Sequence, residues 1–427
     1  MTPTTSLSVD QIDLSDIELW SQGPEVIESA FRTLREHDPI RFFEEPELEG
    51  AMYPRGRGYY ALTRHADVLA ASKQPALFCS GEGTTIVDMP PDFREFLGSM
   101  INMDDPKHAR MRRIVSRGFT PRHLDLMRAD VEATAAELVD SVIERGEGDF
   151  VTDIAATLPL RVIVDLMGVP RSHERFIFDR TNIILGLGDP EYIPDQTPNG
   201  VMTALLVAAQ ELSLFITELA EDRVKDPKDD LITALVSTEV DGEKLTPGEM
   251  ASFFILLVVA GNETTRNAIS HGLLALSRHP EERARWAADF EGLAPTAVEE
   301  IVRWASPVIH FRRTCTRDGV ELGGQTFEEG DKVVLWYSSA NRDAEVFDDP
   351  FRFDLGRTPN DHLGFGGPGP HYCLGAHLAR REITVMFREL FRRMPDLEVT
   401  GEPERLRSNF INGIKHLPAR WTPAPAS

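Results

Sequence analysis

The stretch LGFGGPGPHYCLGAHLARRE, residues 363–382, decides the fold class, because it sets one cysteine between a glycine-rich loop and a helical sequence. Four glycines and two prolines precede Cys373, and residues 374–394 have a helical composition. A helix N-terminus favours negative charge through its free N–H groups and its dipole, and glycines let backbone amides approach a sulfur without an intervening Cβ. The stretch therefore predicts an anionic, metal-bound sulfur at the start of a helix.

The cysteine count limits what this metal site contains. The chain has three cysteines, Cys79, Cys315 and Cys373, which cannot all pair and cannot form a four-cysteine metal site. We expect Cys79 and Cys315 to pack in the core of a protein that resides in a reducing cytoplasm. Because no second cysteine is near Cys373, the other ligands must come from a cofactor. Haem iron with one axial thiolate meets this requirement.

A second pattern predicts a long buried helix over residues 246–277. Thr246 can cap this helix, Pro247 suits its first position, and Glu249 completes a T-x-x-E capping box. The apolar pattern then continues for ~30 residues, or ~45 Å of helix, which is enough to cross a domain of this size.

The polar run AGNETT, residues 260–265, interrupts this helix near its middle. It is not a helix end, because apolar residues resume after it. We expect Ala260, Glu263 and Thr264 to share one side of the helix, since they are three and four positions apart. A carboxylate beside a hydroxyl in a buried helix indicates a device for proton delivery.

The charge balance excludes nucleic acid as a partner over a broad surface. The chain carries 45 basic and 69 acidic side chains, a formal net charge of −24. The segment KHARMRRIVSRGFTPR, residues 107–122, reverses this balance, with six positive residues and no acid. These residues are Lys107, Arg110, Arg112, Arg113, Arg117 and Arg122. The segment indicates a site for an anion, and a solvated helix face is the alternative.

The length of 427 residues allows a large core, and we expect one large, mostly helical domain, since the chain has no linker or repeat. The longest apolar run, residues 253–261, is too short to span a bilayer, and the N-terminus lacks the pattern of a signal peptide.

Several motifs together carry a resemblance to the cytochromes P450. The residues around the cysteine resemble the haem-binding signature of that family: Phe365, Gly366, Gly369, His371, Cys373 and Gly375. AGNETT, EEIVR (299–303) and NRDAEVFDDPFRFDLGR (341–357) resemble further family motifs, in the expected order. The resemblance implies a mainly α, single large cytochrome P450 fold with small β-sheets. Haem would lie between the long helix and the helix after Cys373. The domain would cover 20–421, between an N-terminal extension (1–19) and a C-terminal tail (422–427).

One position departs from the family pattern. The aromatic residue usually stands seven positions before the cysteine, where this chain has Gly366, whereas Phe365 stands eight before it. Because Gly369, His371 and Gly375 keep their offsets, we expect a reshaped loop and not a lost site.

The resemblance also implies a role for each matching residue. Cys373 would bind the iron of haem b, and His108, Arg112, Arg313 and His371 would bind the haem propionates. Further cofactor contacts would come from Ala260, Gly261, Phe365, Gly366 and Gly375. Glu263 and Thr264 match the acid–alcohol pair that relays protons. Glu300 and Arg303 would form a buried structural ion pair, with Arg352 as its third member.

The implied reaction inserts one atom of O₂ into an unactivated C–H bond, while the other oxygen leaves as water. Electrons would come from a ferredoxin and its NAD(P)H-dependent reductase, because the chain has no flavin or iron–sulfur motif. Arg110, Arg113 and Arg117 would form a positive patch for an acidic ferredoxin. We further expect a cytoplasmic monomer without a membrane span.

The sequence more specifically resembles actinobacterial methyl-branched lipid ω-hydroxylases and, less closely, cholesterol side-chain monooxygenases. Residues 83–103 and 183–192 match substrate-channel positions, so we expect terminal hydroxylation of a methyl-branched lipid or isoprenoid, with sterol side-chain hydroxylation as the alternative. A peroxide-driven enzyme usually lacks the acid–alcohol pair. A haem-binding sensor or carrier would need no proton relay, and oxygen consumption with a donor would exclude it.

Overall fold

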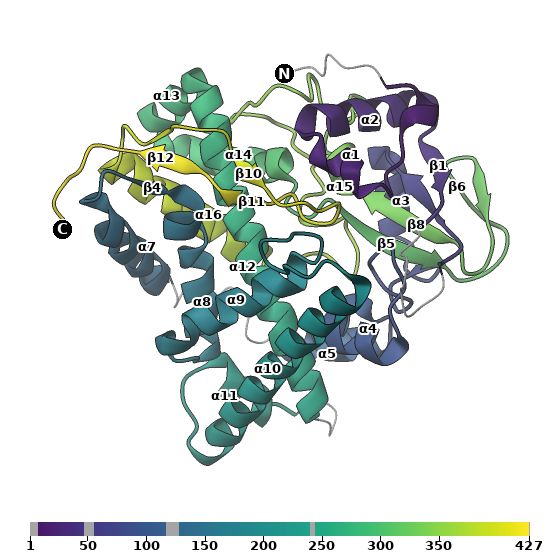
Figure 1. The fold of residues 1–427 in the computed structure, drawn as a ribbon, viewed down its shortest axis with the longest axis horizontal. Helices are drawn as coiled ribbons and strands as arrows, with labels where there is room; N and C mark the ends of the chain where they lie inside the picture. Colours follow the sequence, from purple (N-terminus) through teal and green to yellow (C-terminus); the bar gives the residue numbers. More distant parts are fainter. Residues whose placement is uncertain (1–6, 47–54, 117–127, 240–243, 427) are drawn as a thin grey trace.

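A long central helix, α12 (Pro247–Arg278), organises the fold, and most other helices pack around it (Figure 1). The computed structural model describes residues 7–46, 55–116, 128–239 and 244–426. The mainly helical fold with small sheets agrees with the predicted fold class.

The sequence of α12 explains where it begins. The Thr246 hydroxyl accepts a hydrogen bond from the N–H of Glu249 at 3.2 Å, and the Glu249 carboxylate accepts one from the N–H of Thr246 at 2.9 Å. Pro247 occupies the first turn, and the helix ends at Arg278. The predicted capping box and the predicted helix over 246–277 are therefore confirmed within one residue at each end.

The remaining helices surround α12 and the sheets. Those before it are α1 (Ile17–Ser21), α2 (Pro24–His37), α3 (His65–Ser72), α4 (Pro91–Gly98), α5 (Lys107–Val115), α7 (Arg128–Ile143), α8 (Thr157–Met167), α9 (Glu174–Leu185), α10 (Pro198–Lys225) and α11 (Leu231–Ser237). Those after it are α13 (Pro280–Ala288), α14 (Phe290–Ala305), α15 (Tyr337–Ala340) and α16 (Ala376–Arg393). Shorter helical turns are η1 (Val9–Gln11), η2 (Ser99–Asn102), η4 (Val151–Ala155) and η5 (Arg171–His173).

The strands form small sheets at the periphery of the helices (Figure 1). The largest has the order β1-β2-β8-β5-β3 and comprises β1 (Ile40–Phe43), β2 (Tyr59–Leu62), β8 (Lys332–Trp336), β5 (His310–Cys315) and β3 (Phe78–Cys79). Its β2–β8 pair is parallel, with Tyr59 beside Lys332, and its other pairs are antiparallel. The smaller sheets contain β4 (Glu147–Asp149), β12 (Pro418–Arg420) and β9 (Glu398–Val399); β10 (Glu404–Arg405) and β11 (Ile414–His416); and β6 (Val320–Leu322) and β7 (Gln325–Phe327).

The described part of the N-terminal segment packs against the domain. Ile12 and Leu14 are buried in one hydrophobic cluster with Trp336 of β8. The predicted boundary between an extension (1–19) and the domain stays a prediction, as does the boundary of the C-terminal tail.

Among the described helices, α10 is long and apolar enough, by length and composition, to cross a membrane. It packs against α9, α11 and α12, and its buried positions, such as Leu205, Leu212 and Ile216, repeat with the period of an amphipathic helix. The absence of a membrane span therefore stays a prediction.

A buried ion-pair cluster ties α14 to the segment before the cysteine loop. The Arg303 guanidinium donates two hydrogen bonds of 2.7 Å to the Glu300 carboxylate, and both side chains are fully buried. The third member of the cluster is Arg357, whose guanidinium lies 3.1 Å from the Glu300 carboxylate and also donates to the backbone carbonyl of Asp348.

The prediction that Arg352 is the third member is wrong. Arg352 is exposed and contributes only its backbone carbonyl, which accepts hydrogen bonds from Arg303 and Arg357. The turn over residues 349–357 directs the Arg352 side chain outward and returns the chain to Glu300 five residues later.

We predict that Arg357→Ala destabilises the protein by about 3–5 kcal/mol, because it removes one partner of a buried charge cluster. Arg352→Ala, the matched control, should change the free energy of unfolding by less than about 0.5 kcal/mol. Chemical denaturation of both haem-loaded variants measures this difference. A larger loss in Arg352→Ala would contradict the assignment.

Candidate functional site

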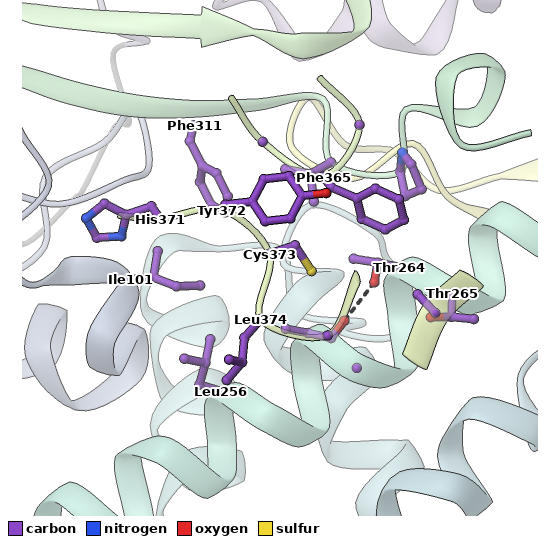
Figure 2. Close-up of a pocket in the computed structure, with 18 of the residues that line it drawn as sticks. Ile101, Leu256, Thr264, Thr265, Phe311, Phe365, His371, Tyr372, Cys373 and Leu374 are labelled. Carbon is purple, nitrogen blue, oxygen red and sulfur yellow. Dashed lines mark hydrogen bonds between the residues drawn. The ribbon is translucent and has the colours of Figure 1, made fainter. Parts of the chain in front are cut away.

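A cavity of about 1580 Å³, counting the part open to solvent, lies between α12 and the loop that carries Cys373 (Figure 2). One wall is the middle of α12, where Ala260, Gly261, Thr264 and Thr265 face the cavity. The rest of its lining is largely apolar: Met100, Ile101, Ile163, Phe253, Leu256, Leu257, Val308 and Phe311 contribute to it. The cavity therefore combines one sulfur with a large hydrocarbon surface.

Cys373 stands three residues before the first residue of α16, as the sequence predicts. Its sulfur is directed into the cavity, with Thr264 and Thr265 on the helix opposite (Figure 2). The apolar surroundings raise the pKa of the Cys373 thiol, while the Gly375 N–H, Arg112 and Arg380 favour the thiolate. A cation bound to the sulfur would replace the thiol proton.

Glycines shape the loop where a side chain would not fit. Gly366 has a φ of +84°, in the left-handed region, and a Cβ on Gly369 would lie 2.6 Å from the carbonyl oxygen of Ser72 at the end of α3. The loop closes on itself, because the Cys373 N–H donates to the Phe365 carbonyl at 3.0 Å. Although Phe365 stands eight positions before Cys373 and not seven, its side chain still lines the cavity.

Two side chains that sequence reasoning missed anchor this loop. Arg380 of α16 lies 4.3 Å from the centre of the Phe365 ring and donates to Glu299 of α14 at 3.0 Å. His362 also bonds to Glu299, at 2.9 Å. Burial alone would raise the pKa of Glu299, but its bonds to His362 and Arg380 hold that pKa at about 2. Glu299 is the first acid of the EEIVR motif, directly before Glu300, and this position is the one signal for it in the sequence.

Basic residues from three parts of the chain meet at one end of the cavity, namely His108 and Arg112 of α5, Arg313 of β5 and His371 of the loop. The rings of His108 and His371 have centroids 4.3 Å apart. Burial, followed by Arg313, His108 and Arg112, lowers the pKa of His371 to about 2. Two arginines and two hydrogen-bonding imidazoles that converge in this way indicate a site for an anion.

These residues fit haem. The Nε2 atom of His108 is buried and lacks a hydrogen-bond partner among the described residues, and the guanidinium of Arg313 donates to the backbone carbonyl of Arg312 at 2.8 Å. Arg112 donates to the backbone carbonyl of Tyr372 at 2.6 Å, which joins the basic end to the cysteine loop. Cys373 would hold the iron, and the four basic residues would hold the two propionates.

The acid–alcohol pair does not share one helix face. Thr264 faces the cavity and donates to the Ala260 carbonyl at 2.8 Å. Glu263 is buried beside Arg266 and Asn267, to which it bonds, and it does not line the cavity. The expectation that Ala260, Glu263 and Thr264 lie on one side is therefore wrong for Glu263, because each helical residue turns by about 100°.

A second cavity has a volume of about 1420 Å³, counting the part open to solvent. Arg266, which bonds to Glu263, lines this cavity. So do Ile183 and Tyr192, whereas no residue from 183–192 lines the cavity at Cys373. The expected substrate-channel segment 183–192 thus borders the second cavity, and the segment 83–103 reaches the cavity of Cys373 through Met100 and Ile101.

The predicted positive patch is smaller than expected. Arg110 bonds to Glu249 of α12 at 2.7 Å and to the Lys244 carbonyl at 3.0 Å, so it joins α5 to the start of α12. Arg113 is exposed on α5. Arg117 lies outside the described residues.

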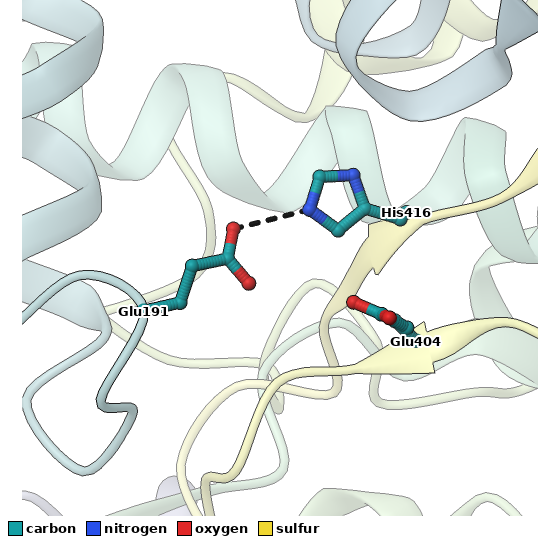
Figure 3. Close-up of side chains that lie close together, drawn as sticks. All are labelled: Glu191, Glu404 and His416. Atoms are coloured by element: carbon teal, nitrogen blue, oxygen red, sulfur yellow. Dashed lines mark hydrogen bonds and ion pairs between the residues drawn. The ribbon is translucent and has the colours of Figure 1, made fainter.

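A group of potential ligands lies away from the cysteine, where Glu191, Glu404 and His416 approach one another (Figure 3). Glu191 bonds to His416 at 3.1 Å and to Lys415 at 2.6 Å, and Asp149 bonds to the other ring nitrogen of His416. Burial lowers the pKa of His416, but Asp149 and Glu191 outweigh it and raise that pKa. Glu191, Asp149, Lys415 and His416 form an ion-pair network that ties the segment after α9 to β11.

Comparisons with known proteins agree with this geometry. The family model for Cytochrome P450 matches residues 176–290 and 293–408. The chain is 51% identical over 424 residues to the methyl-branched lipid omega-hydroxylase of Mycobacterium tuberculosis, covering 99% of this chain and 97% of the relative. It is 40% identical over 396 residues to the steroid C26-monooxygenase of Mycolicibacterium smegmatis, covering 92% and 90%. A cytochrome P450 of Mycobacterium marinum, solved with pseudoionone, superposes with a TM-score of 0.91 at 39% identity, covering 98% of this chain and 100% of the other.

We predict that Arg112→Gln and Arg313→Gln each speed haem loss roughly tenfold to a hundredfold, since a hydrogen bond to a charged group contributes about 1.5–3 kcal/mol. Haem transfer to excess apomyoglobin measures the rate. The control Arg113→Gln changes an exposed arginine of the same helix and should leave the rate unchanged. Equal rates in all three variants would exclude the basic end as the propionate site.

Proposed function

The chain belongs to the cytochrome P450 family and is a monooxygenase, and we propose that it oxidises a long methyl-branched lipid at or near a terminal carbon. The observation that carries this proposal is the 51% identity, over 99% of the chain, to a methyl-branched lipid omega-hydroxylase. The apolar lining of the cavity supports it, because hydrocarbon chains gain about 0.8 kcal/mol for each buried CH₂ group.

We propose haem b as the cofactor; when bound, it supplies the iron chemistry that activates O₂. Cys373 holds the iron, and the Gly375 N–H stabilises the thiolate. His108, Arg112, Arg313 and His371 orient the propionates. Phe365 and Gly366 line the cavity from the cysteine loop, and Ala260 and Gly261 line it from α12, so these residues would contact the cofactor.

Proton delivery is proposed to run from the second cavity to the first. Arg266 lines the second cavity and holds Glu263, whose Oε2 atom has no hydrogen-bond partner among the described residues. Thr264, the next residue, faces the cavity of Cys373. Glu263 would take up a proton at its Oε2 atom from the second cavity and pass it, through water, to the Thr264 hydroxyl oxygen, which would release its own hydroxyl proton into the cavity of Cys373. Such acid assistance is typically worth ~10²–10⁴ in rate.

A cytoplasmic ferredoxin with an NAD(P)H-dependent reductase is the proposed electron source for a monomeric enzyme. Arg113 is exposed on α5, the helix whose residue Arg112 contacts the cysteine loop. An acidic ferredoxin would meet this local positive charge on a protein of net charge −24. The three free thiols suit a reducing cytoplasm.

Sterol side-chain hydroxylation is the second candidate, favoured by the 40% identity to a steroid C26-monooxygenase. A branched lipid and a sterol side chain share a methyl-branched end. The two candidate substrates differ in the size of the part beyond the branched end, which is a flexible chain in the lipid and a fused ring system in the sterol. Binding measurements therefore distinguish them.

We predict that an iso-branched fatty acid binds about fourfold more tightly than the straight-chain acid with one carbon fewer. The added methyl group fills width in the cavity and contributes about 0.8 kcal/mol. Spectral titration of the haem protein measures affinity, and mass spectrometry after turnover with a ferredoxin system should place the hydroxyl at or near the terminal carbon. Much tighter binding of a 3-keto sterol would instead support the second candidate, and turnover with peroxide alone would indicate a peroxide-driven enzyme.

We predict that Arg113→Glu slows ferredoxin-supported haem reduction several-fold at low salt. The effect should fade above ~0.1 M salt, where the Debye length is ~10 Å. The control Arg175→Glu makes the same charge change on α9, at a side chain that is 81% exposed. Stopped-flow reduction should separate the two variants, whereas identical rates would place the ferredoxin elsewhere.

A further inference from the structure

Glu191, Glu404 and His416 form a cluster of potential metal ligands that the monooxygenase activity does not use (Figure 3). One ligand atom of each residue lies within 4.8 Å of those of the other two. The segment between α9 and α10 contributes Glu191, whereas Glu404 belongs to β10 and His416 to β11. Glu191 and His416 line the second cavity, and none of the three residues lines the cavity of Cys373. The cluster is thus a separate place in the fold.

The pairing of β10 with β11 sets Glu404 beside His416. The two strands are antiparallel, and these two residues are directly opposite each other. Opposite residues of antiparallel strands project from the same face, with Cβ atoms about 4.5–5.5 Å apart. The segment after α9 brings Glu191 to this face, and its Oε1 atom lies 3.1 Å from the Nε2 atom of His416 (Figure 3). The backbone therefore places two carboxylates beside one imidazole nitrogen.

A fourth residue, Asp149, orients the imidazole. Its carboxylate bonds to the Nδ1 atom of His416, and it also accepts hydrogen bonds from the N–H groups of Val151 at 2.9 Å and Leu417 at 3.0 Å. A histidine that binds a metal almost always donates its other ring N–H to such a partner, which fixes the tautomer and the direction of the ring. Asp149 thus leaves Nε2 as the ligand atom of His416.

The carboxylates around this nitrogen are only partly neutralised. Lys415 donates to Glu191 at 2.6 Å, through Oε2, and to Asp189 at 3.2 Å. Glu404 is exposed, and its carboxylate makes no hydrogen bond or ion pair with another residue of the described chain. The Oε1 atom of Glu191 and the carboxylate of Glu404 are therefore left to face a cation bound at His416.

The ligand types and their separation fit a tetrahedral transition-metal ion. Zn²⁺ binds imidazole nitrogen at about 2.0–2.1 Å and carboxylate oxygen at about 2.0–2.2 Å, so two such ligands at the tetrahedral angle lie about 3.4 Å apart. The distance of 3.1 Å between Glu191 Oε1 and His416 Nε2 is close to this separation. A rotation of the exposed Glu404 side chain would complete the set. Ca²⁺ and Mg²⁺ prefer oxygen ligands, so the imidazole favours a transition metal.

We propose that Glu191, Glu404 and His416 bind a divalent transition-metal ion, Zn²⁺ in the tests below, with water as the fourth ligand. The ion would replace the proton between Glu191 and His416, and this proton would pass to the solvent. Because the segment of Glu191 connects α9 to α10, the bound ion would join this connection to β10 and β11. The site goes beyond the proposed function and depends on neither the substrate nor the electron donor.

The first test is calorimetric titration of the haem-loaded protein with Zn²⁺ after treatment with a chelator. Glu404→Gln should weaken Zn²⁺ binding by about tenfold or more, because it replaces a ligand carboxylate with an amide, and Asp149→Asn should weaken it about tenfold to a hundredfold through the orientation of His416. The control Glu402→Gln makes the same change two residues before Glu404, at a side chain that is 89% exposed, and should bind Zn²⁺ as the natural protein does.

The second test locates the ion and its effect. X-ray absorption at the zinc edge should show nitrogen and oxygen ligands with one imidazole, whereas sulfur at about 2.3 Å would place the ion at a cysteine and overturn the proposal. Hydrogen exchange should show that Zn²⁺ slows the exchange of amides in 186–197 and 404–416. This slowing should be present in the natural protein and in Glu402→Gln but lost in Glu404→Gln.

Equal Zn²⁺ affinity in the natural protein and in Glu404→Gln would overturn the proposal, as would no binding to the natural protein. Since Glu404 is exposed and its carboxylate has no partner among the described residues, Glu404→Gln should fold and bind haem as the natural protein does. Should the exchange of both segments be the same with and without Zn²⁺ in the natural protein, the ion would not join them, and that part of the proposal would be wrong.

Discussion

The structure depends on holding the Cys373 sulfur at the start of α16, at the edge of a largely apolar cavity. Burial raises the pKa of the thiol, so the thiolate must be stabilised by a bound cation and by nearby donors. The Gly375 N–H supplies one donor, and Arg112 and Arg380 supply positive charge. The same arginines fix the loop, Arg112 through the Tyr372 carbonyl and Arg380 through Glu299. The two arginines that fix the loop therefore also stabilise the thiolate.

Charge compensation explains the polar architecture around this sulfur. Where acids are needed for structure, arginines neutralise them, as Arg303 and Arg357 do for Glu300. Where an anionic cofactor is to bind, basic residues from separate parts of the chain converge on the cavity, as Arg313 and His371 do. The neutralised acids thus stabilise the fold, and the convergent basic residues are left to bind the anionic cofactor.

The sequence predicted well what depends on local pattern. The capping box of Thr246 and Glu249, the helix after Cys373 and the arrival of His108 at the cavity follow from residues close together in the chain. Predictions failed where the direction of a side chain determines which residues it contacts. The choice between Arg352 and Arg357 depends on one turn, and the orientation of Glu263 depends on the helix rotation and on its bond to Arg266.

The most direct test of the central claim is the absorption spectrum of the ferrous carbon monoxide complex. Thiolate ligation by Cys373 predicts the red-shifted Soret band that gives the cytochromes P450 their name, in the natural protein and in Cys315→Ala. Cys373→His should bind haem but show the band of a histidine-ligated protein. Retention of the red-shifted band in Cys373→His, or its loss in Cys315→Ala, would contradict the assignment of the sulfur on which the account depends.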